Sequence, residues 1–549
     1  MSNPHRSVLI IGAGVAGLSA SALLAHHGVE SLLVEKRREV FVYPKARNLT
    51  FRSLEILREL GAGDAVNAVA EHISRMVAKP TLSSHDETAV YEDDFFPSSA
   101  GVSPEPFGRY CPQNRLEPIL LDETRRLGSE ARYGTELESF TQDETGVVAT
   151  IKDLHSGALS EVRADYLLAS DGTHSPIRKQ LGIGASGYGA LPIFVVFVYF
   201  RAPWRQFVPV LGDGDAVKID NPEATGIFIV AQGDLGVFMT TYFPSRGETI
   251  DQFTGERCRE MVLKAVGAPI DLEIVDVAPW QPYEQVADQF RCGRVFLVGD
   301  SAHTMPPLKG GGANTAIQSA HNLAWKLAAV LNRTAAPELL DTYHAERHPV
   351  ARFAARQSLT GPGVQFLQLG EDRPRLAAGE ERPLFYMIAG YRYRSAAVVS
   401  DEPAPTDPDV VQLVDGEQLR GEPGTRVPHA WVRRDGMRVS TLDLLGSGFT
   451  VFTGAAGTPW IAAAAAVSGS LRIPIGVHRI GSDTDDGDSD IRDIDGRWAE
   501  LTGLPPDGAL LVRPDDFVAW RADALPASPE DDLRRVLCHI LHRPVGQGT

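Results

Sequence analysis

Three glycines near the amino terminus have the spacing that binds the phosphates of a dinucleotide. Gly12, Gly14 and Gly17 follow the apolar, β-branched run 8–11 and precede a segment rich in alanine and leucine. In this pattern the first glycine permits a tight turn, the second lets a pyrophosphate approach the backbone, and the third lets helix and strand pack closely. Glu35 ends the next apolar run and suits the hydroxyls of the adenosine ribose. The stretch 8–35 therefore predicts a dinucleotide-binding unit.

A second acid and a second glycine cluster lie far along the chain. Asp300 follows the apolar run 294–298, and Gly310 to Gly312 open a long amphipathic helix. Glycines at a helix start leave backbone N–H groups bare, which favours an anion. Two such sites suit a long cofactor, with pyrophosphate at one end and, at the other, a ring that becomes anionic when reduced. His303 is either a general base or, the reading we favour, a structural residue beside this loop.

Two further turns carry polar residues that suit a cofactor. Asp171 and Gly172 follow the apolar run 165–169, although an Asp-Gly pair after a strand is often only a turn. Arg47 ends the basic loop 43–47 just past the second predicted strand. This arginine belongs either to a solvated basic turn or to a surface that faces the cofactor.

Aromatic residues are spread along the strand-like region 191–243, in which Gly, Pro and Asp separate the apolar runs. We expect an inserted antiparallel sheet there, and one of its faces is a candidate lining for a large apolar pocket. The alternative is that each aromatic side chain simply forms core. The candidate pocket residues are Phe197, Tyr199, Phe228 and Tyr242.

Composition narrows the function classes. The 549 residues carry a formal net charge of −18 and a pI near 5.3, which argues against binding to nucleic acid or to anionic membranes. There is no apolar run of 18 or more residues and no signal peptide, so we expect a cytoplasmic protein. The four cysteines are scattered without metal-ligand spacing, so we expect no metal site.

The chain is too long for one core, so two or three domains are expected. The fold class we predict is α/β, with a Rossmann-like dinucleotide-binding domain, an inserted antiparallel sheet and a smaller carboxy-terminal α/β unit. The predicted ranges are 1–185 with 280–400 for the first domain, 186–279 for the sheet, 401–424 for a Pro/Gly-rich linker and 425–549 for the last unit. The acidic tract 482–490 predicts an exposed loop.

Three motifs resemble the group A FAD-dependent aromatic monooxygenases of the para-hydroxybenzoate hydroxylase superfamily. They are GAGVAGLSA with Glu35, SDGTHSPIR at Asp171, and GRVFLVGDSAHTMPPLKGGGANTAIQSAHNLAWKLA at Asp300. The chain is most similar to the aromatic polyketide hydroxylases of antibiotic pathways. The segments PGTRVPHAWV, STLDLLGSGFTVF and LVRPDDFVAWR resemble the family's thioredoxin-like carboxy-terminal domain, here without a CxxC motif. The resemblance covers essentially the whole chain.

The resemblance implies specific contacts. Asp300 would hold the ribityl-pyrophosphate part of FAD, and the backbone N–H groups of Gly312, Ala313 and Asn314 would face the flavin pyrimidine. Arg47 would meet the pyrophosphate and help recruit NADPH. The implied cofactor-binding residues are Gly12, Gly14, Ala16, Gly17, Glu35, Lys36, Arg47, Gln113, Arg115, Asp171, Gly172, Asp300, Pro307, Gly310, Gly312, Ala313 and Asn314. The implied catalytic residues are Arg47, Pro306 and Gly312.

The activity implied is hydroxylation of a bulky phenolic natural-product intermediate with FAD, NADPH or NADH, and molecular oxygen, through a flavin hydroperoxide. The protein would act as a monomer or homo-oligomer. Alternatives that keep the cofactor are Baeyer–Villiger insertion, epoxidation and a flavin-binding protein that does not oxygenate. The flavin loop departs from the family's common GGxGMNTG at Ala313 and Ala316, which bears on how the flavin ring sits.

Overall fold

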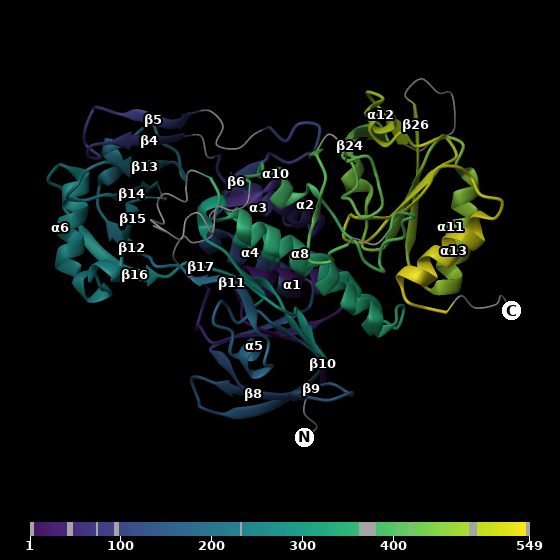
Figure 1. Cartoon of the computed structure of the whole chain (residues 1–549), viewed down its shortest axis with the longest axis horizontal. Helices are drawn as coiled ribbons and strands as arrows, with labels where there is room; N and C mark the ends of the chain where they lie inside the picture. The colour runs from purple at the N-terminus through teal and green to yellow at the C-terminus, as the bar shows by residue number, and fades with distance from the viewer. Residues whose placement is uncertain are drawn as a thin grey trace.

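The computed structural model has a central unit with two further units at opposite ends of the molecule (Figure 1). The structure describes residues 5–40, 48–72, 75–92, 98–230, 233–361, 380–403, 406–416, 419–482 and 491–544. Arg47, with the basic loop around it, and nearly all of the acidic tract 482–490 lie outside these ranges. Within the described ranges no helix is both long and apolar enough to cross a lipid bilayer.

The central unit is built on a mainly parallel sheet in the order β18-β19-β10-β1-β2-β7, with β8 and β9 joined to it through β10. Strand β1 is fully buried at Val8, Leu9 and Ile10, as expected for a parallel strand covered on both faces. The strands are β1 (His5–Ile11), β2 (Ser31–Glu35), β7 (Glu130–Tyr133), β8 (Thr135–Gln142), β9 (Val147–Asp153), β10 (Leu159–Ala169), β18 (Arg291–Cys292) and β19 (Val295–Leu297).

Helices bring the two glycine-rich stretches together. α1 (Val15–His26) follows the first glycines and packs against α4 (Gln113–Arg126) and α7 (Gly311–Leu331). α7 follows the second glycines and also contacts α2 (Phe51–Glu59) and α8 (Asp341–Gln357). Both helix starts therefore lie in one core, as two sites for a single long cofactor would require. The shorter helices of the central unit are α3 (Gly63–Val69), α5 (Pro176–Gln180) and α10 (Phe385–Ile388).

The second sheet lies at one end of the molecule, with α6 (Gly255–Val266) on its outer face (Figure 1). Its order is β16-β12-β15-β14-β13-β4-β5. The strands are β4 (Arg75–Lys79), β5 (Thr88–Glu92), β12 (Phe194–Arg201), β13 (Ala216–Ile219), β14 (Gly226–Ile229), β15 (Leu235–Tyr242) and β16 (Glu273–Trp280). Because β4 and β13 pair in parallel, the sheet is mixed rather than purely antiparallel. It also takes two strands from residues 75–92, which precede the range 186–279 expected for it.

Small sheets and short helices connect these units. β11 (Ala185–Ala190), β17 (Tyr283–Ala287) and β20 (His303–Thr304) form one small sheet. β3 (Asn48–Thr50) pairs with β6 (Gly108–Tyr110), and β21 (Tyr391–Arg392) pairs with β22 (Gln412–Leu413). The 3-10 helices are η1 (Trp204–Phe207), η2 (Pro244–Arg246), η3 (Ile250–Gln252), η4 (Gly299–Ser301), η5 (Pro307–Lys309), η6 (Pro337–Leu340) and η10 (Thr441–Leu444).

The carboxy-terminal unit is a third sheet in the order β24-β23-β27-β26-β25-β28-β29. Helices α11 (Thr458–Leu471) and α13 (Pro529–Ile540) pack in one core with it, and α12 (Arg497–Thr502) packs in another. The strands are β23 (Trp431–Arg434), β24 (Met437–Ser440), β25 (Phe449–Thr453), β26 (Ile475–Ser482), β27 (Ile491–Asp493), β28 (Ala509–Val512) and β29 (Val518–Ala522).

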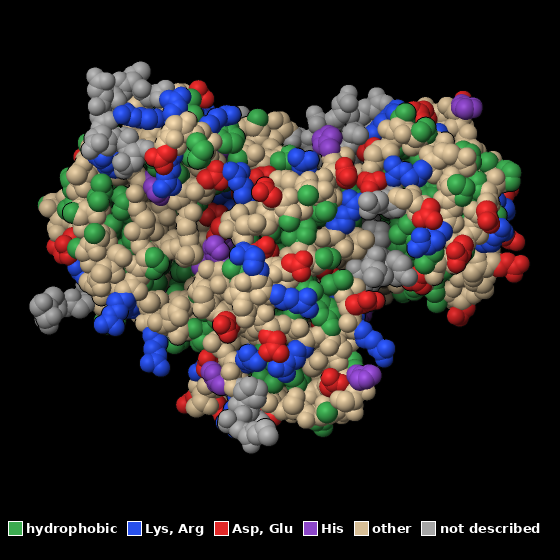
Figure 2. All heavy atoms as spheres, turned by 180° about the vertical axis from the view of Figure 1, so that it is seen from behind, with side chains coloured by type: hydrophobic (Ala, Val, Ile, Leu, Met, Phe, Trp, Pro, Cys, Tyr) green, Lys and Arg blue, Asp and Glu red, His purple; other side chains and the backbone are tan. Residues whose placement is uncertain are grey.

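This last unit shares its core with the helices of the central unit. Trp325 of α7 packs edge-to-face on Phe449, with ring centroids 5.9 Å apart. Asp516, in the loop between β28 and β29, pairs with Arg52 of α2 at 2.7 Å. The carboxy-terminal unit therefore supports α2 and α7. On the face shown in Figure 2, acidic and basic side chains are interspersed rather than gathered by sign.

Candidate functional site

The first glycine-rich turn leaves its backbone open on one side. Gly12 has a φ of +104°, and a side chain there would collide with the carbonyl oxygen of Ser170. A side chain at Gly17 would collide with the carbonyl of Gly12. A Cβ at Gly14, in contrast, would meet nothing closer than Glu117 Oε1, at 3.9 Å. Since no side chain among the described residues caps α1, its first N–H groups are available to an anion.

The motif at Asp300 packs directly against this turn. Gly299 has a φ of +69°, and a Cβ there would lie 2.5 Å from the Cβ of Ala16. Ser170 Oγ donates to the carbonyl oxygens of Ile11 and Gly12, at 2.9 and 2.8 Å. The carboxyl ends of β1, β10 and β19 therefore meet at the start of α1, the edge where parallel sheets bind ligands.

Glu35 is fixed at the end of β2. Its Oε2 accepts from the N–H of Ala13 at 2.7 Å, and its Oε1 accepts from the backbone N–H and Nε of Arg37 at 2.9 and 3.0 Å. Burial by itself raises the pKa of Glu35, but the hydrogen bonds from Arg37 and Ala13 outweigh it and the pKa is lowered. Arg37 was not among the predicted residues, although it lies only two residues after Glu35 in the sequence. Lys36, between them, is exposed.

The carboxylate of Asp171 accepts hydrogen bonds from residues that follow it in the same turn. Its Oδ1 accepts from Ser175 Oγ at 2.6 Å and its Oδ2 accepts from the N–H of Ile177 at 3.1 Å, so it holds the start of α5. Desolvation raises the pKa of Asp171. Gly172 has a φ of +87°, and a Cβ there would meet no atom within 4 Å. The turn therefore offers an accessible backbone beside an occupied carboxylate.

Thr173 and Arg178 join this turn to the loop of Asp300. Arg178 Nη1 donates to the carbonyl oxygen of Ser301 at 2.7 Å, and its Nη2 donates to the carbonyl oxygen of Thr173 at 3.2 Å. The Asp300 side chain reaches solvent, yet desolvation by the surrounding protein raises its pKa to about 6, an effect that the neighbouring Thr173 side chain partly offsets. This carboxyl is positioned to hydrogen-bond hydroxyls that approach the end of β19.

The loop after Asp300 turns through two prolines. Pro306 is buried, whereas Pro307 is exposed and begins η5. His303 is fully buried, with its Nε2 3.4 Å from Ser319 Oγ. Burial, and to a lesser extent the charge of Arg347, lowers the pKa of His303 to about 3. A neutral histidine without solvent contact favours the structural reading of this residue.

The start of α7 resembles the start of α1. Gly310 has a φ of +63°, and a Cβ at Gly311 would lie 2.7 Å from the sulfur of Met305. A Cβ at Gly312 would meet nothing within 4 Å, and Ala313 is half-buried. No described side chain caps this helix either. The open N–H groups and the positive end of the helix dipole therefore suit a second anionic or electron-rich group.

The side chain of Asn314 holds α7 in this position. Its amide donates to the carbonyl oxygens of Asn48 and Gly310, at 2.8 and 2.7 Å. Its oxygen accepts from the Thr50 N–H and hydroxyl, at 2.9 and 3.1 Å, and from Ser53 Oγ at 2.6 Å. The family resemblance implied only a backbone contact for Asn314. Its side-chain role had no local signal, because its partners lie on β3 and α2.

Gln113 and Arg115 stand at the start of α4. Gln113 Nε2 donates to Glu117 Oε1 at 2.5 Å. Arg115 donates to the carbonyl oxygen of Val69 at 2.7 Å and pairs with Asp213 at 2.8 Å. Asp213 also pairs with Arg205 at 2.7 Å, so one carboxylate serves both arginines, and the contact of Arg115 with a cofactor stays a prediction.

The four candidate pocket residues do not share a face of the second sheet. Phe197 and Tyr199 of β12 lie together in a small cluster on the face opposite α6. Phe228 is fully buried in the other core, beneath α6, and Tyr242 stacks there on Phe194 with ring centroids 4.8 Å apart. The expectation of one common pocket face is therefore corrected for Phe228 and Tyr242. Side chains alternate between the two faces of a strand, and the fold decides which face α6 covers.

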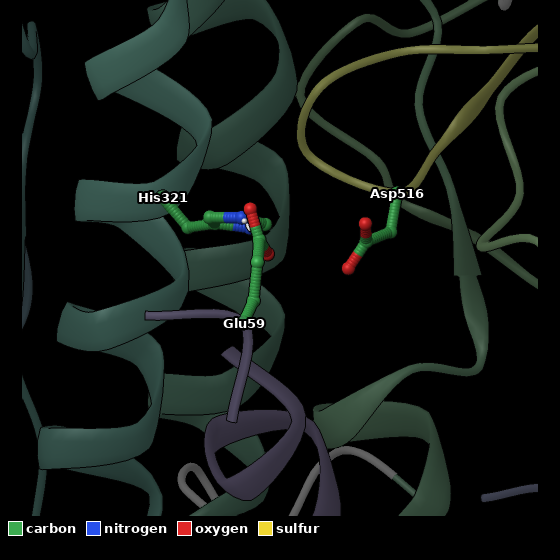
Figure 3. A group of neighbouring side chains, drawn as sticks. All are labelled: Glu59, His321 and Asp516. Carbon is green, nitrogen blue, oxygen red and sulfur yellow. Dashed lines mark hydrogen bonds and ion pairs between the residues drawn. The ribbon is translucent and has the colours of Figure 1, made fainter. Parts of the chain in front are cut away.

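A different group of side chains has metal-ligand types. Glu59, His321 and Asp516 offer ligand atoms within 4.8 Å of one another, with Glu59 beside His321 and Asp516 reaching toward them (Figure 3). Arg52 lies 2.7 Å from Asp516 Oδ2 and 3.3 Å from His321 Nδ1. A metal-bound histidine donates its other ring N–H to an acceptor, and a guanidinium cannot accept. These contacts favour a network of ion pairs between α2, α7 and the carboxy-terminal unit.

Family models match most of the chain. Residues 5–358 match the FAD binding domain, and residues 420–544 match the carboxy-terminal domain of aromatic-ring hydroxylases. Tetracenomycin A2 monooxygenase-dioxygenase from Streptomyces glaucescens is 38% identical, with 100% of this chain and 98% of that protein covered.

Solved structures agree with this assignment. A ternary complex of aklavinone-11 hydroxylase with FAD and aklavinone has a TM-score of 0.87 at 34% identity, covering 98% of this chain and 100% of that one. The flavin-dependent monooxygenase PieE, in complex with FAD and substrate, has a TM-score of 0.83 at 32% identity, covering 99% and 100%. The chain therefore belongs to the FAD-binding aromatic-ring hydroxylases, a family of flavin-dependent monooxygenases related to those of polyketide and antibiotic pathways.

Proposed function

We propose that this protein uses NADPH or NADH and molecular oxygen to hydroxylate a bulky phenolic natural-product intermediate. The observation that carries the proposal is the pairing of two uncapped helix starts, those of α1 and α7, in one core. Each helix start has an acid nearby at a strand end, Glu35 on β2 or Asp300 after β19. A two-ended cofactor such as FAD needs this combination.

The proposed contacts divide along the cofactor. The backbone at Gly12, Gly14, Ala16 and Gly17 receives the pyrophosphate, and Glu35, aided by Lys36, binds the adenosine ribose. Asp300 binds hydroxyls of the ribityl chain. The remaining proposed cofactor residues are Arg47, Gln113, Arg115, Asp171, Gly172, Pro307, Gly310, Gly312, Ala313 and Asn314.

Bound FAD would supply the redox chemistry, which is hydride uptake from the nicotinamide and then transfer of one oxygen atom through a flavin hydroperoxide. The chain's part is to hold and orient the ring and to exclude water. Gly312 and Ala313 present N–H donors to the pyrimidine edge, where negative charge develops. Arg47, Pro306 and Gly312 are the residues we propose for direct roles in the reaction.

The proposed substrate pocket lies on the face of the second sheet opposite α6. Phe197 and Tyr199 are on this face, and their rings are 6.3 Å apart at 21°. A flat, stacked pair of aromatic rings suits an aromatic ligand. The solved complexes named above contain aklavinone or a substrate, which supports an aromatic small molecule here as well.

We further propose the domain ranges given above, with 75–92 added to the second sheet. The carboxy-terminal unit would be thioredoxin-like, structural and without redox activity, since no CxxC is present. The protein would act in the cytoplasm as a monomer or homo-oligomer.

The test is to load the purified protein with FAD and follow NADPH and NADH oxidation in air with a panel of phenols of increasing size. We expect one compound to stimulate oxidation and to yield a phenol heavier by one oxygen atom. An ester or epoxide product would replace hydroxylation with Baeyer–Villiger insertion or epoxidation. A yellow protein that no compound stimulates would contradict the proposed monooxygenase reaction, and a protein that binds no FAD would contradict the whole proposal.

A further inference from the structure

Arg347 of α8 is a fully buried cation. Its Nε donates to Ser319 Oγ at 3.2 Å, and its Nη1 donates to the hydroxyls of Tyr391 and Tyr393 at 3.1 and 3.0 Å. Its Nη2 donates to the carbonyl oxygen of Thr315 at 3.3 Å. Every partner that these bonds reach is a neutral oxygen.

The other fully buried arginines have carboxylate partners. Arg52 pairs with Glu55 and Asp516, Arg426 with Glu55, and Arg513 with Glu346 and Asp515. Arg347 has no ion-pair partner within 4.0 Å among the described residues. Burying a charge without a counter-charge is costly, and proteins rarely tolerate it without a functional reason.

The titratable groups that face Arg347 do not supply a negative charge. Burial is the main reason that the pKa of Tyr343 and that of Tyr393 are raised, so both hydroxyls stay protonated. Burial, with the charge of Arg347, lowers the pKa of His303 to about 3, so His303 is neutral. The hydroxyl of Tyr391 donates a hydrogen bond to Gln318 Oε1, at 2.8 Å. The carboxylates of Glu346 and Asp515 also act on Tyr393, but they pair with Lys326 and Arg513, so the site keeps a net positive charge.

The charge of Arg347 lies behind the start of α7. Thr315 and Ser319 belong to the second and third turns of that helix, and Gly312 is three residues before Thr315. With a rise of about 1.5 Å per residue, the guanidinium lies on the order of 10 Å from the open N–H groups at Gly312. It adds a full charge to the partial positive charge of the helix dipole at the same end.

We propose that Arg347 is the buried counter-charge for the anionic form of reduced FAD. The proposal rests on the proposed function, because it needs the flavin ring at the start of α7. Hydride transfer from NADPH to FAD gives FADH⁻ and NADP⁺, so reduction adds one negative charge to the ring. Arg347 thus stabilises the anionic flavin that forms only on reduction. This role explains why its charge has no carboxylate partner in the apoprotein.

The test measures the pH at which the bound reduced flavin changes from its anionic to its neutral absorption spectrum, after anaerobic reduction with dithionite. In Arg347→Met and Arg347→Gln, this pH should rise by about one unit relative to wild type, as expected for one charge on the order of 10 Å away at an effective dielectric constant of about 20. Arg347→Lys should keep most of the wild-type value. Tyr393→Phe removes one hydrogen bond but no charge, and should stay within about 0.3 units.

An unchanged transition in a neutral variant that binds FAD would overturn the proposal. If neither neutral variant folds, the wild type decides, since the proposal requires its anionic form to persist below the pH at which free reduced FAD is protonated in the same buffer. Equal values for bound and free FAD would overturn it as well. Dithionite reduction needs neither substrate nor NADPH, so this result is independent of hydroxylation, whereas failure to bind FAD would contradict the proposed function instead.

Discussion

Replacing Asn314 with alanine should loosen the start of α7 and release FAD. The side chain is 3% exposed and makes five hydrogen bonds to β3, α2 and the glycine turn. Alanine has no polar atoms, so the variant leaves the N–H of Thr50 and the carbonyls of Asn48 and Gly310 without these partners. The open glycine backbone at the helix start would then no longer be held against its neighbours.

The structure sets the magnitude of this effect. A hydrogen bond contributes about 0.5 to 1.5 kcal/mol net, and a buried group left unpaired costs about 1 to 3 kcal/mol. Allowing the Thr50 and Ser53 hydroxyls to find new partners leaves three backbone groups unpaired, or about 3 to 9 kcal/mol of unfolding free energy. Asn314→Asp keeps the oxygen that accepts three hydrogen bonds but replaces the donating amide with a second oxygen that faces the carbonyls of Asn48 and Gly310, so it should not restore the lost stability.

The assay pairs urea unfolding of the apoprotein, followed by tryptophan fluorescence, with titration of FAD. We expect a lower urea midpoint and at least tenfold weaker FAD binding for Asn314→Ala. Asn332→Ala is the matched control, because Asn332 is exposed at the other end of the same helix and should change stability by less than about 0.5 kcal/mol. A loss below about 1 kcal/mol in Asn314→Ala, together with normal FAD affinity, would refute this reasoning.

Three further outcomes are expected. Gly14→Val should abolish FAD binding but leave the stability of the apoprotein nearly unchanged, because a Cβ fits at this position. Gly255→Ala, at the capped start of α6, is the control. If Gly14→Val still binds FAD, the pyrophosphate site proposed at Gly14 is contradicted. Glu35→Gln should weaken FAD binding at least tenfold, as measured by equilibrium titration, since it removes one hydrogen-bond acceptor and the ion pair with Arg37. An unchanged affinity for FAD would argue against a contact between Glu35 and the ribose. The pKa of Asp300 is raised to about 6, so its ionised form is disfavoured in the folded apoprotein. Asp300→Asn should therefore raise the thermal unfolding midpoint when it is measured above pH 6, but not when it is measured below pH 4. An equal gain under both conditions would contradict this reasoning.

Local features of the fold were predictable because they depend on neighbouring residues. The turn at Gly12 and the helix after it follow from glycine positions and apolar runs within 30 residues of each other. The start of α7 at Gly311 follows in the same way from its three glycines. The second sheet was predicted only in part, because strands β4 and β5 come from residues 75–92, whose polar, irregular sequence carries no clear two-residue period.

The sequence by itself determined the family and the chemistry of the cofactor. The three motifs carry enough information in residue type and spacing to indicate an FAD-dependent aromatic hydroxylase, and the comparisons agree. That information is local, since backbone geometry fixes where a glycine turn bares N–H groups and where a strand ends in an acid.

Only the tertiary structure decided how distant side chains combine. It set Gly299 against Ala16, gave Asn314 its partners, and separated Phe197 from Phe228 on opposite faces of one sheet. It also left Arg347 buried without a carboxylate while the other fully buried arginines have one. These contacts join residues that lie up to hundreds of positions apart, and they depend on which faces of the helices and sheets pack together. The spacing of residues along the chain does not show which faces those are.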